Sequence, residues 1–205
     1  SGTWSPDSQF FAYVVFAEGR NQMVIVQSSN GRVSQRLTFE NTDIGAIANP
    51  SWSPDNRYLA FSGSVGGITD LFLYDLEAES IIRLTDDKYA DFQPTWSPDS
   101  QTLAFTSDRG PQTNFENLTY SRFQLATVDI ATREIEVVPV FGNVKHINPQ
   151  CSADGSSLYF ISDQDGFSDV YELNLENDEV RRVTNLATAV SGITYLAPAL
   201  SVSRS

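Results

Sequence analysis

Short apolar stretches in which hydrophobic and polar residues alternate recur along the whole chain, and Gly, Pro, Asn or Asp residues separate them. The pattern is clearest between residues 49 and 85, where four segments follow one another: NPSWSP, RYLAFSG, TDLFLYDL and SIIRLT. Successive residues of a strand point to opposite faces, so Leu71 and Leu73 share one face while Phe72 and Tyr74 share the other. Between its ends, the sequence has no stretch with the sustained 3.6-residue periodicity of an amphipathic helix. The pattern predicts units of four short β-strands.

One motif recurs at the start of each unit. It reads TWSPDS from Thr3, SWSPDN from Ser51, TWSPDS from Thr95 and, in degenerate form, QCSADG from Gln150. A further start, PALS, follows at residues 198–201. The aligned residues Trp4, Trp52, Trp96, Cys151 and Leu200 are separated by 48, 44, 55 and 49 residues. The chain is therefore a tandem repeat.

The motif itself has a structural interpretation. Pro54 and Pro98 fix φ at the first corner of a tight turn, and Asp55 and Asp99 can accept hydrogen bonds from nearby backbone N–H groups. The preceding Trp is large and flat enough to fill the space between two sheets, and burying its ring removes ~150 to 250 Å² from water. We interpret the motif as a hairpin turn next to a core residue.

Four-stranded units of this length in tandem are typical of a β-propeller, in which blades stand face to face around a central channel. The sequence predicts an all-β fold with one propeller domain over residues 1–205 and antiparallel units at about 4–51, 52–95, 96–150 and 151–199. The strands that carry Trp are expected to be innermost. The third unit is longer because of an insertion at roughly Arg109 to Phe123.

Charge and composition narrow the range of partners. The 26 acidic residues against 13 basic ones give a net charge of −13, and the basic residues are scattered singly. This argues against nucleic acid and anionic lipid and favours a basic protein or peptide partner. The apolar run from Phe10 to Ala17 is too short to span a membrane, so we expect no direct membrane insertion. Cys151 and His146 are each unique, which leaves no Cys/His metal framework.

The segments P-S/T-WSPD, LAF-S, D-LFLYD and RLT resemble the TolB-like, WD-type propeller repeats of bacteria. This resemblance implies a non-catalytic, protein- or peptide-binding module linked to cell-envelope transport or integrity, in the periplasm of a gram-negative bacterium. Similar blades also form accessory propellers of prolyl-oligopeptidase-like and tricorn-like peptidases. A substrate-gating propeller of such an enzyme is therefore the alternative function.

Propellers of the TolB-like family usually have six blades, whereas the chain supplies four intervals. We expect an incomplete arc of a propeller with six or more blades. In the alternative arrangement, Pro198 to Ser203 closes a small ring by occupying a gap in the first unit. An arc leaves open blade edges, so we also expect possible self-association.

Candidate binding residues lie in the loops that lead from one unit to the next. Ile47, Asp91, His146 and Tyr195 stand three positions before each unit's Pro, and we expect them to ring the channel mouth. The loop residues Asp86, Asp87 and Tyr89 combine charge with an aromatic ring, which suits a basic peptide. The alternatives are varied loop residues and a solvated acidic surface.

No catalytic residue, metal or cofactor is expected. A Ser-His-Asp arrangement would have to use His146, and no G-x-S-x-G motif occurs. The stretch from Asp163 to Asp169 has oxygen ligands at alternate positions, as calcium loops do, but lacks the twelve-residue pattern. A hairpin in which Gly166 supplies a positive φ is the simpler interpretation.

Overall fold

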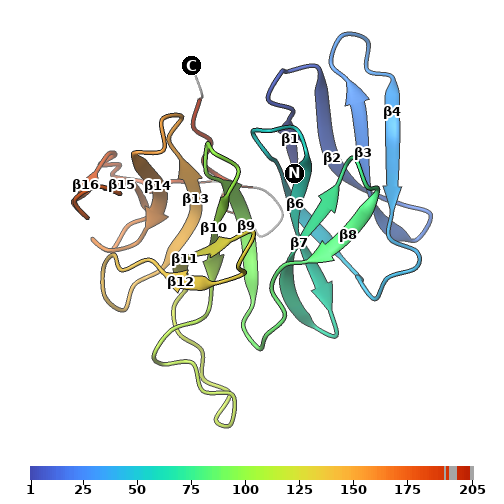
Figure 1. The fold of residues 1–205 in the computed structure, drawn as a ribbon. Helices are drawn as coiled ribbons and strands as arrows, with labels where there is room; N and C mark the ends of the chain where they lie inside the picture. The colour runs from blue at the N-terminus through green and yellow to red at the C-terminus, as the bar shows by residue number, and fades with distance from the viewer. Residues whose placement is uncertain (192, 194–197, 204–205) are drawn as a thin grey trace.

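The computed structural model describes residues 1–191, 193 and 198–203. Within these residues the chain forms sixteen β-strands and no helix (Figure 1). The strands form four antiparallel sheets, each a meander of four consecutive strands. The predicted all-β fold with four-stranded units is therefore confirmed.

Each sheet is one blade, and the blades follow one another in the sequence. Blade 1 contains β1 (Gly2–Trp4), β2 (Phe10–Ala17), β3 (Arg20–Gln27) and β4 (Val33–Thr38). Blade 2 contains β5 (Ile47–Trp52), β6 (Tyr58–Val65), β7 (Ile68–Asp75) and β8 (Ser80–Arg83). Blade 3 contains β9 (Asp91–Trp96), β10 (Thr102–Ser107), β11 (Gln124–Asp129) and β12 (Ile135–Val137). Blade 4 contains β13 (His146–Cys151), β14 (Ser157–Ser162), β15 (Asp169–Asn174) and β16 (Val180–Arg182).

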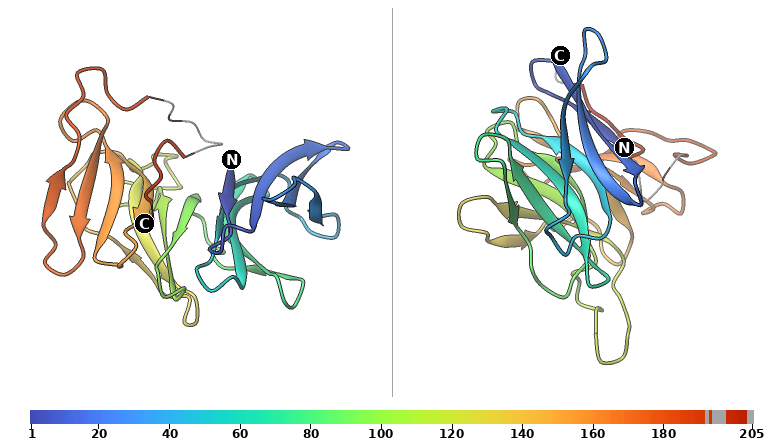
Figure 2. Two further views of the ribbon diagram at one scale, coloured as in Figure 1. Left: turned by 90° about the horizontal axis from the view of Figure 1, so that it is seen from above. Right: turned by 90° about the vertical axis from the view of Figure 1, so that its right-hand side faces the viewer.

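The blades stand side by side in an open arc, which Figure 2 shows from above. The inner strands β1, β5, β9 and β13 contact one another in this order. Blade 1 already has four strands, and residues 198–203 form no strand. The ring-closing alternative is therefore wrong, because the first unit has no gap to fill.

Two of the three Trp residues of the repeat, Trp52 and Trp96, lie between neighbouring blades, as predicted. Trp52 is 6% exposed and packs against blade 1, where its ring lies 6.4 Å from that of Phe10. Trp96 is 3% exposed and stacks on Tyr58 of blade 2 at 6.2 Å. The Trp96 indole N–H donates to the Ser51 carbonyl at 3.0 Å, so this hydrogen bond also fixes the orientation of the ring between the blades. Each blade thus buries an apolar face against the blade before it.

The turn after each Trp uses the Ser of the motif as well as the Asp. In blade 2, the Ser53 hydroxyl donates to Asp55 at 2.5 Å and accepts the Tyr58 N–H at 2.8 Å, and Asp55 also accepts the Arg57 N–H at 3.0 Å. The same Ser–Asp pair recurs in all four blades. In blade 4, hydrogen bonds from Ser152 and Ser156 lower the pKa of Asp154 to about 2. The motif is a self-satisfied hairpin turn.

A second repeated contact ties the third strand to the end of the fourth. In blade 2, the buried carboxylate of Asp70 pairs with Arg83 at 2.6 Å, and Thr85 accepts the Leu71 N–H at 2.9 Å. Blade 4 repeats this set, which we call the Asp–Arg–Thr clasp, with Asp169, Arg182 and Thr184. The clasp accounts for the RLT segment of blade 2 and the RRVT segment of blade 4, whereas the RLT segment of blade 1 faces Gln22 in place of the Asp.

Environment sets the ionisation of the two clasp carboxyls in opposite directions. Burial raises the pKa of Asp70 and outweighs the opposing effect of Arg83. Burial also acts to raise the pKa of Asp169, but hydrogen bonds from Thr184 and Arg182 outweigh it and hold that pKa below its usual value. The Thr184 hydroxyl donates to Asp169 at 2.7 Å, and the Leu186 N–H donates at 3.0 Å. The clasp of blade 4 is the better satisfied of the two.

The face of blade 1 that points away from blade 2 has no neighbouring blade within the described residues. Ala12 packs toward blade 2, so strand alternation turns Phe11 and Tyr13 to the other side, beside Trp4. Trp4 is 57% exposed, although it is the repeat equivalent of Trp52 and Trp96. We call Trp4, Phe11 and Tyr13 the Trp4 face. It has the composition of a blade interface without a blade against it.

We predict that the isolated chain self-associates through the Trp4 face. Trp4→Glu should shift the protein toward monomer in sedimentation velocity across a dilution series, because a charge there opposes burial of the face. Phe167→Glu is the matched control, since Phe167 is 56% exposed in the β14–β15 hairpin. A wild-type chain that stays monomeric at every concentration would contradict this prediction.

We also predict that the two acidic partners of Arg83 differ in their contribution to stability. Asp70→Ala should lower the free energy of unfolding by about 2–4 kcal/mol, because it removes the buried partner. Asp86→Ala removes the exposed partner at 2.9 Å and should cost less than about 1 kcal/mol. Urea denaturation of both variants measures the difference. Equal losses of unfolding free energy in the two variants would show that the buried pair stabilises the fold no more than the exposed one.

Candidate functional site

A central channel of about 850 Å³ runs along the inner strands of all four blades. Its lining includes the turn prolines Pro6, Pro54 and Pro98, so the channel reaches the end of the arc where the WSPD turns lie. Residues 198 and 200–203 also line it. An irregular extended segment of the chain therefore lies along the channel next to blade 4.

The channel wall carries a repeated backbone feature that the sequence analysis did not single out. Asn49, Gln93 and Asn148 each precede the repeat Pro, each has a positive φ between 52° and 57°, and the strand register shifts at each of them. These are β-bulges at equivalent places in β5, β9 and β13. The recurring Asn/Gln-Pro pair is the signal from which they could have been found.

The bulges connect each inner strand to the preceding blade. Ser1 Oγ accepts the Asn49 N–H at 3.1 Å, Ser62 Oγ accepts the Gln93 N–H at 3.2 Å, and Gln93 Oε1 accepts the Asn148 N–H at 3.0 Å. The series continues into the tail, where Asn148 Oδ1 accepts the Ala199 N–H at 2.9 Å. Side-chain oxygens thus accept the backbone N–H groups of the bulges and of the tail.

The predicted channel-mouth residues lie at equivalent places but are buried. Ile47, Asp91 and His146 are the first residues of β5, β9 and β13, and they are 4%, 0% and 0% exposed. Their side chains pack inside the arc and do not line an open mouth. Tyr195 lies outside the described residues. A binding role for these four positions stays a prediction.

Asp91 lies in a closed polar cluster of blade 3. The Ser107 hydroxyl donates to it at 2.6 Å, and the Arg109 guanidinium pairs with it at 2.6 Å. Burial raises the pKa of Asp91 to about 7, although Arg109 and Ser107 act in the opposite direction. Arg109 also pairs with Asp87 at 3.0 Å. The charge expected to face a partner is thus committed to an internal pair.

His146 lies between the rings of Phe141 and Phe160, whose centroids are 5.9 and 5.5 Å from its own. Its Nε2 is 3.4 Å from the Phe141 carbonyl oxygen. Burial lowers the pKa of His146, which favours the neutral ring. This position fits a core histidine and gives the ring no access to a substrate.

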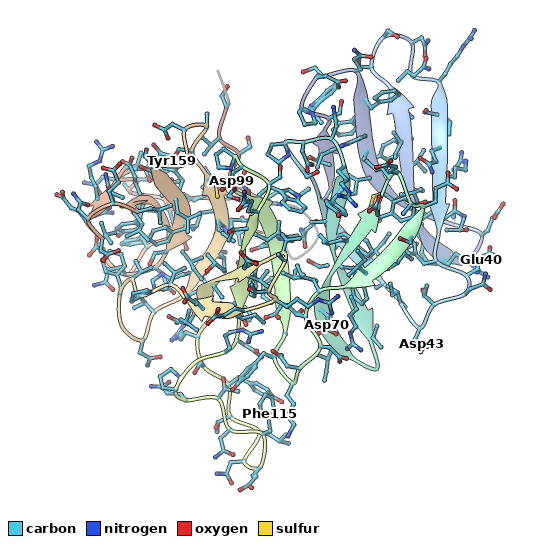
Figure 3. All side chains as sticks on the ribbon, in the orientation of Figure 1. Glu40, Asp43, Asp70, Asp99, Phe115 and Tyr159 are labelled. Carbon is cyan, nitrogen blue, oxygen red and sulfur yellow. The ribbon has the colours of Figure 1, made fainter. Side chains whose placement is uncertain are left out.

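The acidic loop before β9 is largely neutralised by arginines. Asp86 pairs with Arg83, Asp87 pairs with Arg109, and the Tyr89 ring lies 5.0 Å from the Arg109 guanidinium. Figure 3 shows Glu40 and Asp43, which lie in the loop between β4 and β5, on the blade 1 side of the molecule.

The stretch from Asp163 to Asp169 forms the β14–β15 hairpin, with Gly166 at φ +87°. Its carboxylates have other partners: Asp163 accepts the Lys145 N–H, Asp165 accepts the Tyr171 hydroxyl, and Asp169 belongs to the clasp. Across the described residues, no three His, Cys, Asp or Glu side chains come together as metal ligands would. The calcium interpretation therefore gains no support.

Comparison with known proteins agrees with this architecture. The family described as the TolB beta propeller domain matches residues 1–134. The chain belongs to this family. Its blades 1 and 2 and most of blade 3 lie in the matched region, which confirms the resemblance noted in the repeat motifs.

Individual relatives match part of their own length. The Tol-Pal system protein TolB of Ruthia magnifica subsp. Calyptogena magnifica is 33% identical over 87 residues, which are 42% of this chain and 20% of that protein. TolB from Acinetobacter baumannii has a TM-score of 0.71 at 23% identity over 90% of this chain and 43% of its own. A puromycin-hydrolyzing peptidase of Mycobacterium tuberculosis has a TM-score of 0.66 at 15% identity over 93% and 30%. The two structural matches show a shared fold. The chain spans less than half the length of each of these proteins.

The part of the chain that the structure describes contains no helix with the length and apolar character of a membrane span.

The buried carboxyl of Asp91 predicts a pH dependence of stability. An unfolded Asp ionises near pH 4, whereas folded Asp91 ionises near 7. Between these values the folded state holds the extra proton, so the free energy of unfolding falls as pH rises, by at most about 1.4 kcal/mol per pH unit. Asp91→Asn should remove this contribution, which urea unfolding at pH 5 and pH 7 measures.

Asp87→Asn is the control, because it removes the other, more exposed partner of Arg109 and leaves Asp91 in place. His146 acts with the opposite sign, since its lowered pKa reduces stability as pH falls below about 6.5. His146 is present in the wild type and in both variants, so its contribution to the pH dependence cancels when they are compared. Identical pH dependence in the wild type and Asp91→Asn would refute the prediction.

Proposed function

We propose that this chain is the propeller part of a non-catalytic, TolB-type module that binds an extended segment of a protein partner in the central channel. The channel wall supports this proposal. Its amide oxygens accept backbone N–H groups from the bulge at Asn148 and from the tail at Ala199. A peptide segment of a partner offers backbone N–H groups of the same kind.

The channel also has the dimensions and composition for such a ligand. Its volume of about 850 Å³ is at the upper end of the usual range for small-molecule sites and is open along the arc. Prolines, Trp side chains and small polar residues line it, which provides apolar surface and hydrogen-bonding groups together. These features suit a chain segment better than a compact polar metabolite.

The net charge of −13 favours a basic partner through long-range attraction. Because Asp86, Asp87 and Asp91 are paired with arginines, we assign this attraction to the charge of the whole molecule. The relatives named Tol-Pal system protein TolB suggest that the partner belongs to that system. We propose the periplasm as the compartment on the same basis.

A second candidate is the accessory propeller of a peptidase, in which the blades control access to an active site on another domain. The match to the mycobacterial peptidase favours it, since that match covers 93% of this chain. The burial of His146 indicates that the catalytic base would come from elsewhere. Peptidase activity of the full-length protein, abolished by a serine hydrolase inhibitor, would select this second candidate.

Binding in the channel predicts a selective effect of Gln150→Arg. Gln150 lines the channel, so a longer charged side chain should obstruct an extended ligand. Affinity for a purified protein of the Tol-Pal system, measured by isothermal titration calorimetry, should fall at least about tenfold, which is about 1.4 kcal/mol. Gln164→Arg, in the exposed β14–β15 hairpin, adds the same charge and should leave affinity unchanged.

Equal binding by the two variants would place the partner outside the channel. If no protein of that system binds the wild-type chain, the proposed function fails.

A further inference from the structure

A separate pocket of about 530 Å³ lies where the blade 3 insertion meets blades 3 and 4, and we call it the insertion pocket. Its volume is within the range of about 300–1,000 Å³ that ligand sites usually have. It lies near the beginning of the inner strands and shares only Gln93 with the channel lining. The inference below therefore does not rest on the proposed function. The main lining residues are Ala90, Phe92, Asp108, Tyr120, Phe123, Lys145 and Ile147.

The insertion, which leaves the blade between β10 and β11, is held by its own contacts (Figure 1). The Phe123 carbonyl accepts the His146 N–H at 2.8 Å, and the Phe123 ring meets Phe92 edge to face at 4.8 Å. At its base, the Thr113 hydroxyl donates to the Asp108 carbonyl at 2.6 Å, and Ser121 Oγ accepts the Gln112 N–H at 2.9 Å. The wall of the pocket is thus formed before any ligand binds.

Most of the pocket surface is apolar. Ala90 and Lys145 directly precede β9 and β13, and Phe92 and Ile147, two residues further along each chain segment, also line the pocket. Phe92 and Ile147 are buried and form the inner part, whereas Phe123 and Tyr120 are 36% and 56% exposed. Exposed aromatic rings around an apolar interior indicate a surface suited to a large hydrophobic side chain.

One basic residue, Lys145, lines the pocket, and it has no ion-pair partner among the described residues. Every ion pair among the described residues uses an arginine, and no described carboxylate lies within 4.0 Å of the Lys145 ammonium. The two nearby carboxylates accept backbone hydrogen bonds instead. Asp108 accepts the Ala90 N–H at 2.8 Å, and Asp163 accepts the backbone N–H of Lys145 at 2.8 Å.

We propose that the insertion pocket binds the C-terminus of a peptide whose last residue is large and apolar. The Lys145 ammonium pairs with the terminal carboxylate, and the last side chain packs against Phe92, Phe123 and Ile147. A terminal carboxylate complements the charge of Lys145, and the apolar side chain beside it complements the aromatic wall. The peptide groups before the last residue lie near Ser121 and the Asp108 carboxyl.

The test compares two peptides, acetyl-Gly-Gly-Phe as the free acid and as the amide, in titrations of the full chain followed by NMR. We expect the wild type to bind the acid at least tenfold more tightly than the amide. Lys145→Met keeps the aliphatic stem and should reduce affinity for the acid to that of the amide. The control is Lys88→Met, because Lys88 is the only other lysine in the chain and lies over the Phe115 ring, outside the pocket lining. It should leave both affinities unchanged.

Several outcomes would overturn the proposal. Equal binding of acid and amide to the wild type removes the role of the carboxylate, and this comparison needs no variant. An equal loss in Lys88→Met shows that net charge alone is responsible. If 3-phenylpropionate, which has the acid and the ring without peptide groups, binds as tightly as the peptide acid, the occupant is a small aromatic acid and not a peptide C-terminus. Absence of binding to the wild type refutes the site itself.

Discussion

The fold depends on apolar contact between neighbouring blades. Each of the three buried clusters draws its residues from two adjacent sheets: blades 1 and 2, blades 2 and 3, and blades 3 and 4. Because a single sheet cannot bury both of its faces alone, every blade needs a neighbour. Trp52 and Trp96 occupy the centre of two of these contacts, and Cys151 takes the equivalent place in the third. Stability is therefore a sum of nearest-neighbour terms, as in other repeat proteins.

Much of this architecture could be predicted because the information is local. The turn chemistry of Ser53, Pro54 and Asp55 lies within a few residues, and strand alternation is visible in single segments. Because the turn motif and the strand alternation occur in four units, each weak local pattern is supported by three others. The interval lengths alone left two ways to complete the fold, and the choice between them depended on β1, which already supplies the inner strand of blade 1.

The surroundings of the candidate site residues were less predictable. Asp91 stands in an acidic segment that reads as a surface loop, but the chain enters β9 at this residue, and Ser107 and Arg109 enclose its carboxyl. His146 is enclosed in the same way by Phe141 and Phe160. Burial of a polar side chain is decided by residues from other strands, and no local pattern encodes it. The insertion pocket depends on packing across two blades and could not be read from spacing.

Blade 3 differs from its neighbours in two respects that have one physical explanation. Where blades 2 and 4 have Asp, Arg and Thr, strand pairing places Gln124, Val137 and Pro139. The clasp would hold the chain at the first residue after the β10–β11 hairpin, the point from which the insertion returns. Within the described chain, blade 3 has no such buried ion pair at the start of β11. A longer β10–β11 connection therefore breaks no ion pair there. The absence of the clasp thus permits a longer β10–β11 connection but does not impose one, since blade 1, with Gln22 at the position of Asp70, keeps a short hairpin in which β2 ends at Ala17 and β3 begins at Arg20.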